Sequence, residues 1–365
     1  MLSELDEQLC HQVAAPFGEV ATSDHRFYDR NWFCSHHPTD GLAFITGLAC
    51  YPNMNVLDGY VAIQQGGVQY NLRLSRQLRP AVGDLRIGQL RQEVVTPLHA
   101  IRLVLEPSND FPAAFDLLWE GFLAVHEEAH HHTERDGRTV EDTRRYKQLG
   151  KVRGWMDLHG QRHVADAWFG IRDHSWGVRP GVGGFEPLTS TSAVTGSPGP
   201  RGLALWLDFA NDEMGGNLIL VEDSEGRRVR LDGVVRWPDG VGRPAARVVD
   251  VAHDLSFFPG TQAFESGRVI LRTDDDNEYV MEAWPAVTAW AYSGTGYDGG
   301  FRDGLGLGAY RGNLCVEVDE YDVSHPEQVL LDGIPVPPGH REQPVQLKLN
   351  GRLGHGKWTV LPAIR

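Results

Sequence analysis

Residues 170–179 hold the side chains of this chain that are best suited to acid–base chemistry. The run reads Gly-Ile-Arg-Asp-His-Ser-Trp-Gly-Val-Arg. In an extended strand alternate residues share a face, so Arg172, His174 and Trp176 should point one way. Asp173 and Ser175 should then point the other way, and charges buried on either face need partners. The run predicts either a strand that lines a polar pocket, or an Arg–Asp bridge between two domains with Trp176 in the core.

The chemistry that these residue types support is proton transfer to or from an apolar substrate. Hydration or isomerisation of an alkene needs a general acid whose pKa is raised by an apolar wall. Asp173 or His174 is the candidate acid or base. Arg172 would orient the carboxylate or hold a substrate oxygen with two hydrogen bonds. Trp176 would form a wall that faces a developing positive charge.

Two further segments supply candidate substrate-binding residues. Residues 23–28 read Ser-Asp-His-Arg-Phe-Tyr, and Asp24, His25 and Tyr28 are candidates there, with a polar entry loop as the alternative. Tyr297 and Asp298 lie in a glycine-rich stretch that would allow close approach of backbone to a ligand. The alternative for that stretch is a hairpin turn with a packed tyrosine.

The segment 126–130, His-Glu-Glu-Ala-His, matches the zinc-protease signature. That signature works only on a helix, where the two histidines lie one turn apart. The preceding apolar residues alternate and are interrupted by Gly121, which favours a strand. A zinc hydrolase therefore stays an alternative, beside a solvated loop and a surface metal site made by His126, His130 and His132 on one side of a strand.

Four stretches of the chain together resemble a known group of proteins. They are Asp29–Phe33 (DRNWF), Tyr146–Gly154 (YKQLGKVRG), the RDHSWG run at 172–177, and Gly296–Gly304 (GYDGGFRDG). This pattern resembles an uncharacterised bacterial group related to the AttH-like and carotenoid 1,2-hydratase superfamily. RDHSWG is its specific part.

The resemblance implies two consecutive lipocalin-like β-barrels. Enzymes of the wider superfamily include carotenoid 1,2-hydratase, kievitone hydratase and fungal pericyclases, which act on largely apolar substrates without redox cofactors. No residue role carries over from this group, so Arg172, Asp173, His174 and Trp176 rest on the motif and its chemistry.

Composition limits the classes of partner. The chain has 365 residues, 41% of them hydrophobic, and a formal net charge of −15. Such a surface repels nucleic acid and anionic lipid. The acidic start has no signal-peptide pattern, and no stretch reaches the roughly 20 apolar residues of a membrane span. The four cysteines form no CxxC pair and predict free thiols. We expect a cytoplasmic protein, and a homodimer is compatible with the sequence.

Short alternating segments between glycine turns predict a mostly β fold with few short helices. Residues 61–74 predict two strands around Gly66-Gly67, with further strands at 85–87, 101–105 and 203–209. Hairpins are expected at 217–231 and 268–284. The expected division is an N-terminal helix and lead-in at 1–20, a lipocalin-like barrel at 21–180, and a second barrel at 181–365, with a linker or long loop at 187–201.

The sequence thus predicts a cofactor-independent lyase or isomerase. Its substrate would be a hydrophobic terpenoid, steroid-like or aromatic molecule in an apolar barrel pocket. The alternative is a non-catalytic carrier of the same kind of ligand. A titratable group inside the apolar pocket would distinguish the catalyst from the carrier.

Overall fold

The structure is a computed structural model of the chain. It describes residues 4–7, 11, 14–135, 137–184, 201–297, 301–325, 328–336 and 342–362. These residues form antiparallel β-strands and three short 3₁₀ turns, η1 (Glu4–Glu7), η2 (Pro52–Met54) and η3 (Tyr292–Thr295). None of them forms a helix with the length and apolarity that crossing a bilayer requires.

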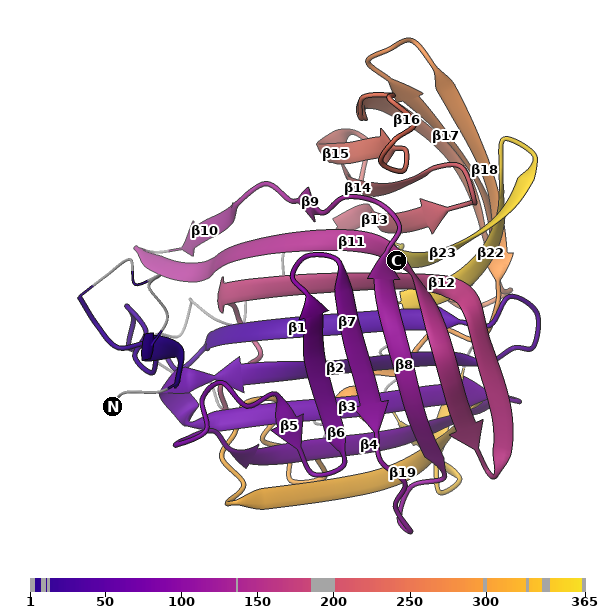
Figure 1. Cartoon of the computed structure of the whole chain (residues 1–365). Helices are drawn as coiled ribbons and strands as arrows, with labels where there is room; N and C mark the ends of the chain where they lie inside the picture. Colours follow the sequence, from indigo (N-terminus) through magenta and orange to yellow (C-terminus); the bar gives the residue numbers. More distant parts are fainter. Residues whose placement is uncertain are drawn as a thin grey trace.

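The larger unit is an open sheet of 15 strands (Figure 1). Its main path runs β21-β20-β19-β4-β3-β2-β1-β12-β11-β8-β7-β6-β5, and β9 and β10 pair with β11. The strand bounds are β1 Phe27–His36, β2 Ala43–Tyr51, β3 Val56–Gln65, β4 Val68–Gln77, β5 Arg86–Ile87, β6 Leu90–Thr96, β7 Ala100–Leu105, β8 Ala113–Gly121, β9 His126–Glu127, β10 His131–Arg135, β11 Arg138–Leu158, β12 Gln161–Val178, β19 Leu314–His325, β20 Gln328–Leu331 and β21 Ile334–Val336.

The open sheet curls over its own hydrophobic core. Figure 1 shows β5–β8 in front of β1–β4. The core between these two layers holds Phe33, Phe44, Phe115 and Trp119, which are 0–1% exposed. Burial of such large side chains contributes on the order of 2 kcal/mol each and fixes the curl. We call the side of β1, β11 and β12 that faces this core the inner face.

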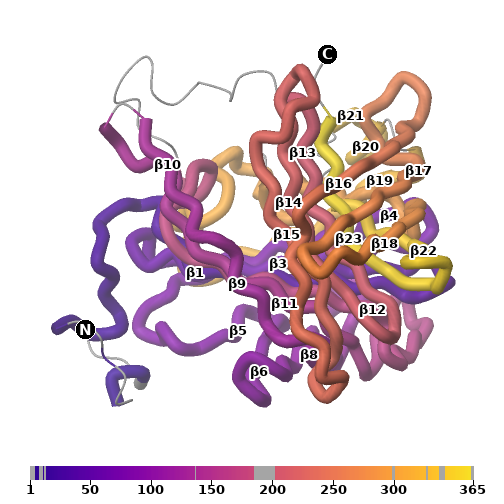
Figure 2. The backbone as a smooth tube through the Cα atoms, turned by 90° about the horizontal axis from the view of Figure 1, so that it is seen from above, coloured from indigo at the N-terminus to yellow at the C-terminus, as the bar shows by residue number. Residues whose placement is uncertain are grey.

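The smaller unit is a closed eight-stranded barrel. Its strands are β13 Arg201–Ala210, β14 Gly215–Asp223, β15 Arg228–Arg236, β16 Ala246–Phe257, β17 Phe264–Thr273, β18 Glu278–Pro285, β22 Glu342–Leu349 and β23 Arg352–Leu361. Leucine, valine, Phe209 and Trp358 side chains fill its interior. Figure 2 shows these strands standing over the β11–β12 side of the open sheet, in agreement with contacts of β13 with β11 and of β23 with β12.

A third hydrophobic cluster joins the two units. It packs Trp32 and Ile171 of the open sheet against Ala210 of the barrel and against Trp290 and Tyr292 near η3. We call this side of β1, β11 and β12 the outer face, because it meets the barrel and the described residues of 286–297 and 301–313. The sheet is therefore covered on both faces, and polar groups on either face are partly or fully removed from water.

The mostly β class and the expected hairpins are confirmed. Gly66 and Gly67, at φ +62° and +82°, join β3 to β4, and the hairpins β14–β15 and β17–β18 lie where the sequence places them. The expectation of two closed barrels is wrong for the first half, which forms the open sheet. Strands β19–β21 lie in the second half of the sequence and pair with β4. In residues 1–20 the described structure shows only the η1 turn, and most of the predicted linker at 187–201 lies outside the described residues.

Candidate functional site

Strand pairing separates the RDHSWG run into two sets of side chains. On β12, Arg172 and His174 lie across from Gln148 and Tyr146 of β11, and all four point to the inner face. Asp173 points to the outer face, toward arginines on β1 and β11. The alternation predicted for the run is confirmed. Arg172 therefore cannot orient the Asp173 carboxylate, because the sheet lies between them.

The motif glycine has a structural reason. Gly177 adopts φ +128°, and a Cβ atom there would lie 2.0 Å from the carbonyl oxygen of Asp142. Only glycine fits this crossing of β12 and β11. Part of the RDHSWG signature thus maintains the fold rather than the chemistry.

On the outer face, Asp173 lies between two buried arginines. Its carboxylate oxygens are 3.8 Å from Nη2 of Arg30 and 3.8 Å from Nε of Arg145. Arg145 is also 3.6 Å from Glu128. Burial opposes the charge on Arg30 and Arg145, but the nearby carboxylates outweigh burial and raise the pKa of both groups.

Aromatic rings and a third arginine surround this ion cluster. The Arg179 guanidinium lies 4.8 Å from the ring centre of Tyr28 and donates to Tyr297 Oη at 3.3 Å. Arg30 lies 5.7 Å from the Tyr297 ring. Burial, with a contribution from Arg30, lowers the pKa of Arg179. No carboxylate of the described residues lies within ion-pair distance of Arg179, so within this part of the chain its charge is buried without a partner of opposite sign.

Many polar atoms of this face have no hydrogen-bond partner among the described residues. Eight buried atoms share this condition: the phenol oxygens of Tyr28, Tyr51 and Tyr60, the Nε atoms of Arg30, Arg145 and Arg179, Oδ1 of Asp173 and Oγ of Ser175. We call these eight residues the outer-face cluster. An unsatisfied buried polar group costs about 1–3 kcal/mol, so eight would cost roughly 8–24 kcal/mol, which is as large as the whole net stability of a domain, roughly 5–15 kcal/mol. We therefore expect ordered water or a ligand to satisfy them.

Small residues beneath the cluster bring its groups close together. Tyr60 Oη lies over Gly47 of β2, where an added Cβ would be 2.8 Å from that oxygen. Burial raises the pKa of Tyr60, with the arginine charge of Arg30 acting in the opposite direction. Tyr60 is therefore a neutral phenol that can donate a proton or a hydrogen bond.

The inner face carries a second polar group, whose members bond to one another. Nε2 of His174 lies 2.7 Å from Oδ1 of Asp29, and Nδ1 of His174 lies 3.0 Å from the Tyr146 hydroxyl. We call Asp29, His174 and Tyr146 the inner-face relay. Asp29 and His174 are 53% and 33% exposed, so the relay has access to solvent. Burial raises the pKa of Tyr146, and Arg172 acts against this rise.

Arg172 lies next to the relay and is 4% exposed. Its Nε and Nη2 atoms both donate to Oε1 of Gln148, at 3.1 and 2.8 Å. Its guanidinium lies 4.8 Å from the ring centre of Trp119 and 5.3 Å from that of Tyr146. Burial lowers the pKa of Arg172. An amide and two ring faces, rather than a carboxylate, hold this cation.

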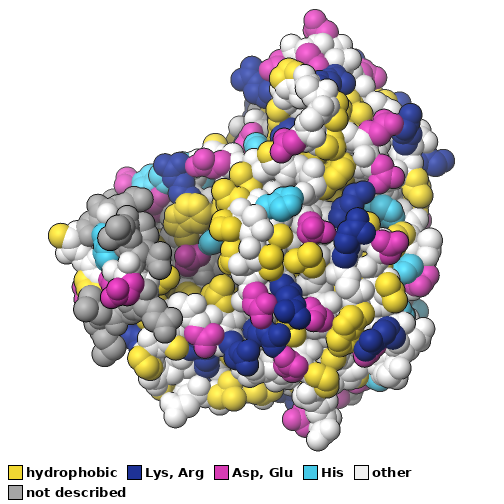
Figure 3. Space-filling model, viewed as in Figure 1, with side chains coloured by type: hydrophobic (Ala, Val, Ile, Leu, Met, Phe, Trp, Pro, Cys, Tyr) yellow, Lys and Arg dark blue, Asp and Glu magenta, His cyan; other side chains and the backbone are white. Residues whose placement is uncertain are grey.

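The remaining predicted residues lie at one end of the open sheet or outside the described residues. Trp176, 37% exposed, and Asp24 line a surface cavity of about 470 Å³. Figure 3 shows the molecule hollowed on its left side in the same view as Figure 1. Arg26 already neutralises Asp24 through two hydrogen bonds, and His25 lies 3.9 Å from that carboxylate. Asp298 lies outside the described residues.

The His-Glu-Glu-Ala-His segment is extended and pairs with β11, so the helix that a zinc protease needs is absent from it. His126 lies opposite Lys147 and does not meet the other histidines. Of the predicted metal set of His126, His130 and His132, the structure brings only the last two together. His130 and His132 instead converge with Asp142 of β11.

Sequence reasoning found Asp173, Tyr28 and Tyr297 but missed their partners. Arg30 falls inside the Asp29–Phe33 stretch that carries the resemblance, and Arg145 immediately precedes the Tyr146–Gly154 stretch. Their positions in or next to these stretches are the feature of the sequence that could have identified them as site residues. The sequence does not single out Tyr51 or Tyr60, because no neighbouring residue in the chain shows which tyrosine will face a charge.

Comparison with solved structures finds matches over most of the chain at low sequence identity, and the one with a TM-score above 0.5 shows the fold. A putative AttH from Nitrosomonas europaea is 12% identical, with a TM-score of 0.53, covering 93% of this chain and 94% of that one. Kievitone hydratase from Nectria haematococca is 10% identical (TM-score 0.41; 91% and 88% covered), and CghA with Sch210972 is 9% identical (TM-score 0.47; 92% and 88% covered). The predicted resemblance is confirmed at the level of fold.

No curated protein matches the sequence. A family model described as a family of unknown function (DUF8625) matches residues 2–361, nearly the whole chain. The chain therefore belongs to this family of unknown function.

Proposed function

We propose that this protein is a cofactor-independent acid–base lyase or isomerase that binds an apolar small molecule with an anionic group at the outer-face cluster. The observation that carries the proposal is the set of eight buried polar atoms without protein partners on one face. Water alone could satisfy them. A substrate with oxygen atoms does so as well, and it gains strength from the dry surroundings.

The charge balance of the cluster supports an anionic ligand. The cluster and its neighbour Glu128 bring three guanidinium groups, those of Arg30, Arg145 and Arg179, together with two carboxylates. Asp173 pairs with Arg30 and Arg145, and Glu128 pairs with Arg145, whereas Arg179 pairs with neither carboxylate. Glu128 also lies 3.3 Å from Lys147, which takes up part of its charge. A carboxylate or enolate on the ligand would balance the excess positive charge, and arginine suits this task through two parallel hydrogen bonds.

The same groups provide the parts of proton transfer. Asp173, whose Oδ1 accepts no hydrogen bond from the described residues, can remove a proton from the substrate. The phenol of Tyr60 or Tyr28 can return one, and the arginines stabilise negative charge that develops on a substrate oxygen. The reaction moves protons without net oxidation. Trp32 and Tyr292 of the adjoining hydrophobic cluster would contact the apolar part of the substrate.

A binding experiment tests the charge requirement. The probe is cis-parinaric acid, an apolar carboxylate whose fluorescence rises on binding, and its methyl ester is the neutral control. We expect Arg179→Met to weaken binding of the acid about tenfold or more and to leave the ester unchanged. Arg272→Met, on the exposed surface of β17, is the matched control. Equal loss of acid and ester, or no loss, contradicts the anionic ligand.

An exchange experiment tests catalysis against mere carriage. Apolar aromatic and isoprenoid carboxylic acids are incubated with the protein in D₂O, and deuterium incorporation is followed by mass spectrometry. For any acid that exchanges, Asp173→Asn should lower the rate by about 10²-fold or more, whereas Asp254→Asn on the barrel should not. If neither the wild type nor Asp173→Asn catalyses exchange, and the wild type still binds cis-parinaric acid, the protein is a carrier.

The inner-face relay is a second candidate place for the same chemistry. A carboxylate, an imidazole and a phenol in series can pass a proton, and Arg172 beside them can hold a substrate oxygen. His174→Ala distinguishes the two faces. Loss of exchange in His174→Ala with full activity in Asp173→Asn would move the reaction to the inner face.

A further inference from the structure

We propose that His130, His132 and Asp142 form a zinc-binding site at the end of the open sheet. The register of β10 and β11 places His132 directly across from Asp142. His130 precedes β10 by one residue and lies on the same side as His132. One nitrogen from each histidine and one carboxylate oxygen lie within 4.8 Å of one another.

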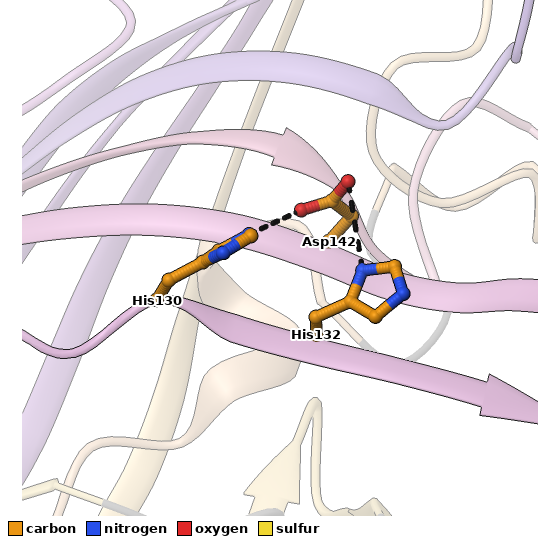
Figure 4. A group of neighbouring side chains, drawn as sticks. All are labelled: His130, His132 and Asp142. Carbon is orange, nitrogen blue, oxygen red and sulfur yellow. Dashed lines mark hydrogen bonds and ion pairs between the residues drawn. The ribbon is translucent and has the colours of Figure 1, made fainter.

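The Asp142 carboxylate is shared between the two rings, as Figure 4 shows. Nε2 of His130 lies 2.5 Å from Oδ1, and Nδ1 of His132 lies 3.7 Å from Oδ2. Ligand atoms about 2.0–2.1 Å from a tetrahedral zinc ion are separated by roughly 3.4 Å. The observed separations lie on both sides of this value, so small rotations of exposed side chains would admit the ion.

The second nitrogen of His132 is held by a carboxylate. Nε2 of His132 lies 3.3 Å from Oε1 of Glu134. A hydrogen bond there keeps the proton on Nε2 and leaves Nδ1 free to bind a metal. This carboxylate–histidine–metal arrangement is a common support of zinc ligands. The contact between His132 and Glu134 therefore supports the site in addition to the positions of the three ligand atoms.

The donor set favours zinc over the hard cations. Two imidazoles and one carboxylate suit Zn²⁺, whereas Ca²⁺ and Mg²⁺ prefer sites made of oxygen. Arg144 is the nearby cation on β11, and Glu127 lies 3.8 Å from it.

The site opens onto the cavity described above. His130 and Asp142 line it together with Arg144 and Trp176. Three protein ligands leave one position of a tetrahedral ion for water or a small anion. The proposed ion thus lies on the same side of β11 as Tyr146, because residues 142, 144 and 146 alternate with regular pairing to β12.

Calorimetric titration of the full, tag-free, EDTA-treated chain with ZnCl₂ at pH 7.5 tests the site. We expect one Zn²⁺ per chain with a dissociation constant in the micromolar range or below. His132→Ala and Asp142→Asn should each weaken binding at least tenfold, and Glu134→Gln should weaken it less. Bound Co²⁺ should give the visible absorption of a four-coordinate ion, and its quenching of tryptophan fluorescence should fall in Trp176→Phe.

The matched control is the neighbouring histidine. His131 lies near Thr133 and Glu141 rather than Asp142, so His131→Ala should bind Zn²⁺ as the wild type does. Binding should weaken in more acidic buffer, because protons compete with the metal ion for its ligands. Absence of saturable binding by the wild type, or an equal loss in His131→Ala and His132→Ala, would overturn the proposal. Circular dichroism confirms that each variant is folded.

Discussion

On the inner face of β1, β11 and β12, Asp29, His174 and Tyr146 bond to one another and two of them reach solvent. In the outer-face cluster, eight polar atoms on these and neighbouring strands are buried without a hydrogen-bond partner among the described residues. Residues next to each other in the chain thus meet opposite conditions. The difference separates groups that the protein satisfies by itself from groups that need water or a ligand.

The two faces also differ in the number of charged groups that they bury. The inner face buries one guanidinium, Arg172, between an amide and two rings. The outer face buries several charges of both signs, and Asp208 of the barrel lies 3.5 Å from Lys147 and 3.0 Å from Lys357. The outer face therefore joins the two structural units by ionic contacts, and it should respond more strongly to loss of a charge.

The largest effect on stability is expected from Asp208→Asn. Asp208 is fully buried, and its replacement would remove the nearest negative charge of Lys357 and one of the two carboxylates beside Lys147. Removing one member of a buried ion group costs about 3–5 kcal/mol. Asp29→Asn on the inner face, at a half-exposed ion pair, should cost less than about 1 kcal/mol. Urea unfolding measures both, and equal losses would contradict the comparison.

A pH-dependent effect of intermediate size is expected from His36 on the outer face. Its Nε2 lies 3.1 Å from Nδ1 of His355 on β23. Burial, followed by His355, lowers the pKa of His36 from 6.5 to about 3. The folded state then binds fewer protons than the unfolded state below pH 6.5, so stability falls as the pH is lowered from 6.5 toward 3.

Between pH 6.5 and 5 this loss amounts to about 2 kcal/mol for one such group. Thermal unfolding across this range should show a shallower acid decline in His36→Gln than in the wild type. His174→Gln, on the partly exposed relay, should keep the decline. An unchanged slope in His36→Gln would show that the sheet–barrel contact does not respond to this histidine.

The sequence was informative wherever a signal is local. Glycine turns and alternation predict the hairpins, and alternation alone places Arg172 and Asp173 on opposite faces. Closure of the first half was predicted wrongly, because the pairing of β19 with β4 joins Asp319 to Asn71 across nearly 250 positions. Such pairing leaves no mark in either segment.

The candidate site was predictable only in part for the same reason. Asp173, Tyr28 and Tyr297 are conspicuous by type, whereas Arg30 and Arg145 become their partners only when β1, β12 and β11 align. Asp142 belongs to the proposed zinc site because the cross-strand register places it opposite His132. The spacing of the histidines in the sequence suggests His126 instead.

The smallest expected effect compares two tyrosines that differ in their hydroxyl partners. Tyr146→Phe removes the bond to His174 and should cost about 1 kcal/mol. Tyr60→Phe removes a buried hydroxyl that has no partner among the described residues and for which, without ligand, ordered water is the expected partner, so stability should change by less than about 0.5 kcal/mol. Urea unfolding without ligand gives both values. A large loss in Tyr60→Phe would mean that its hydroxyl is held within the folded protein, and the outer face would then no longer differ from the inner face in this respect.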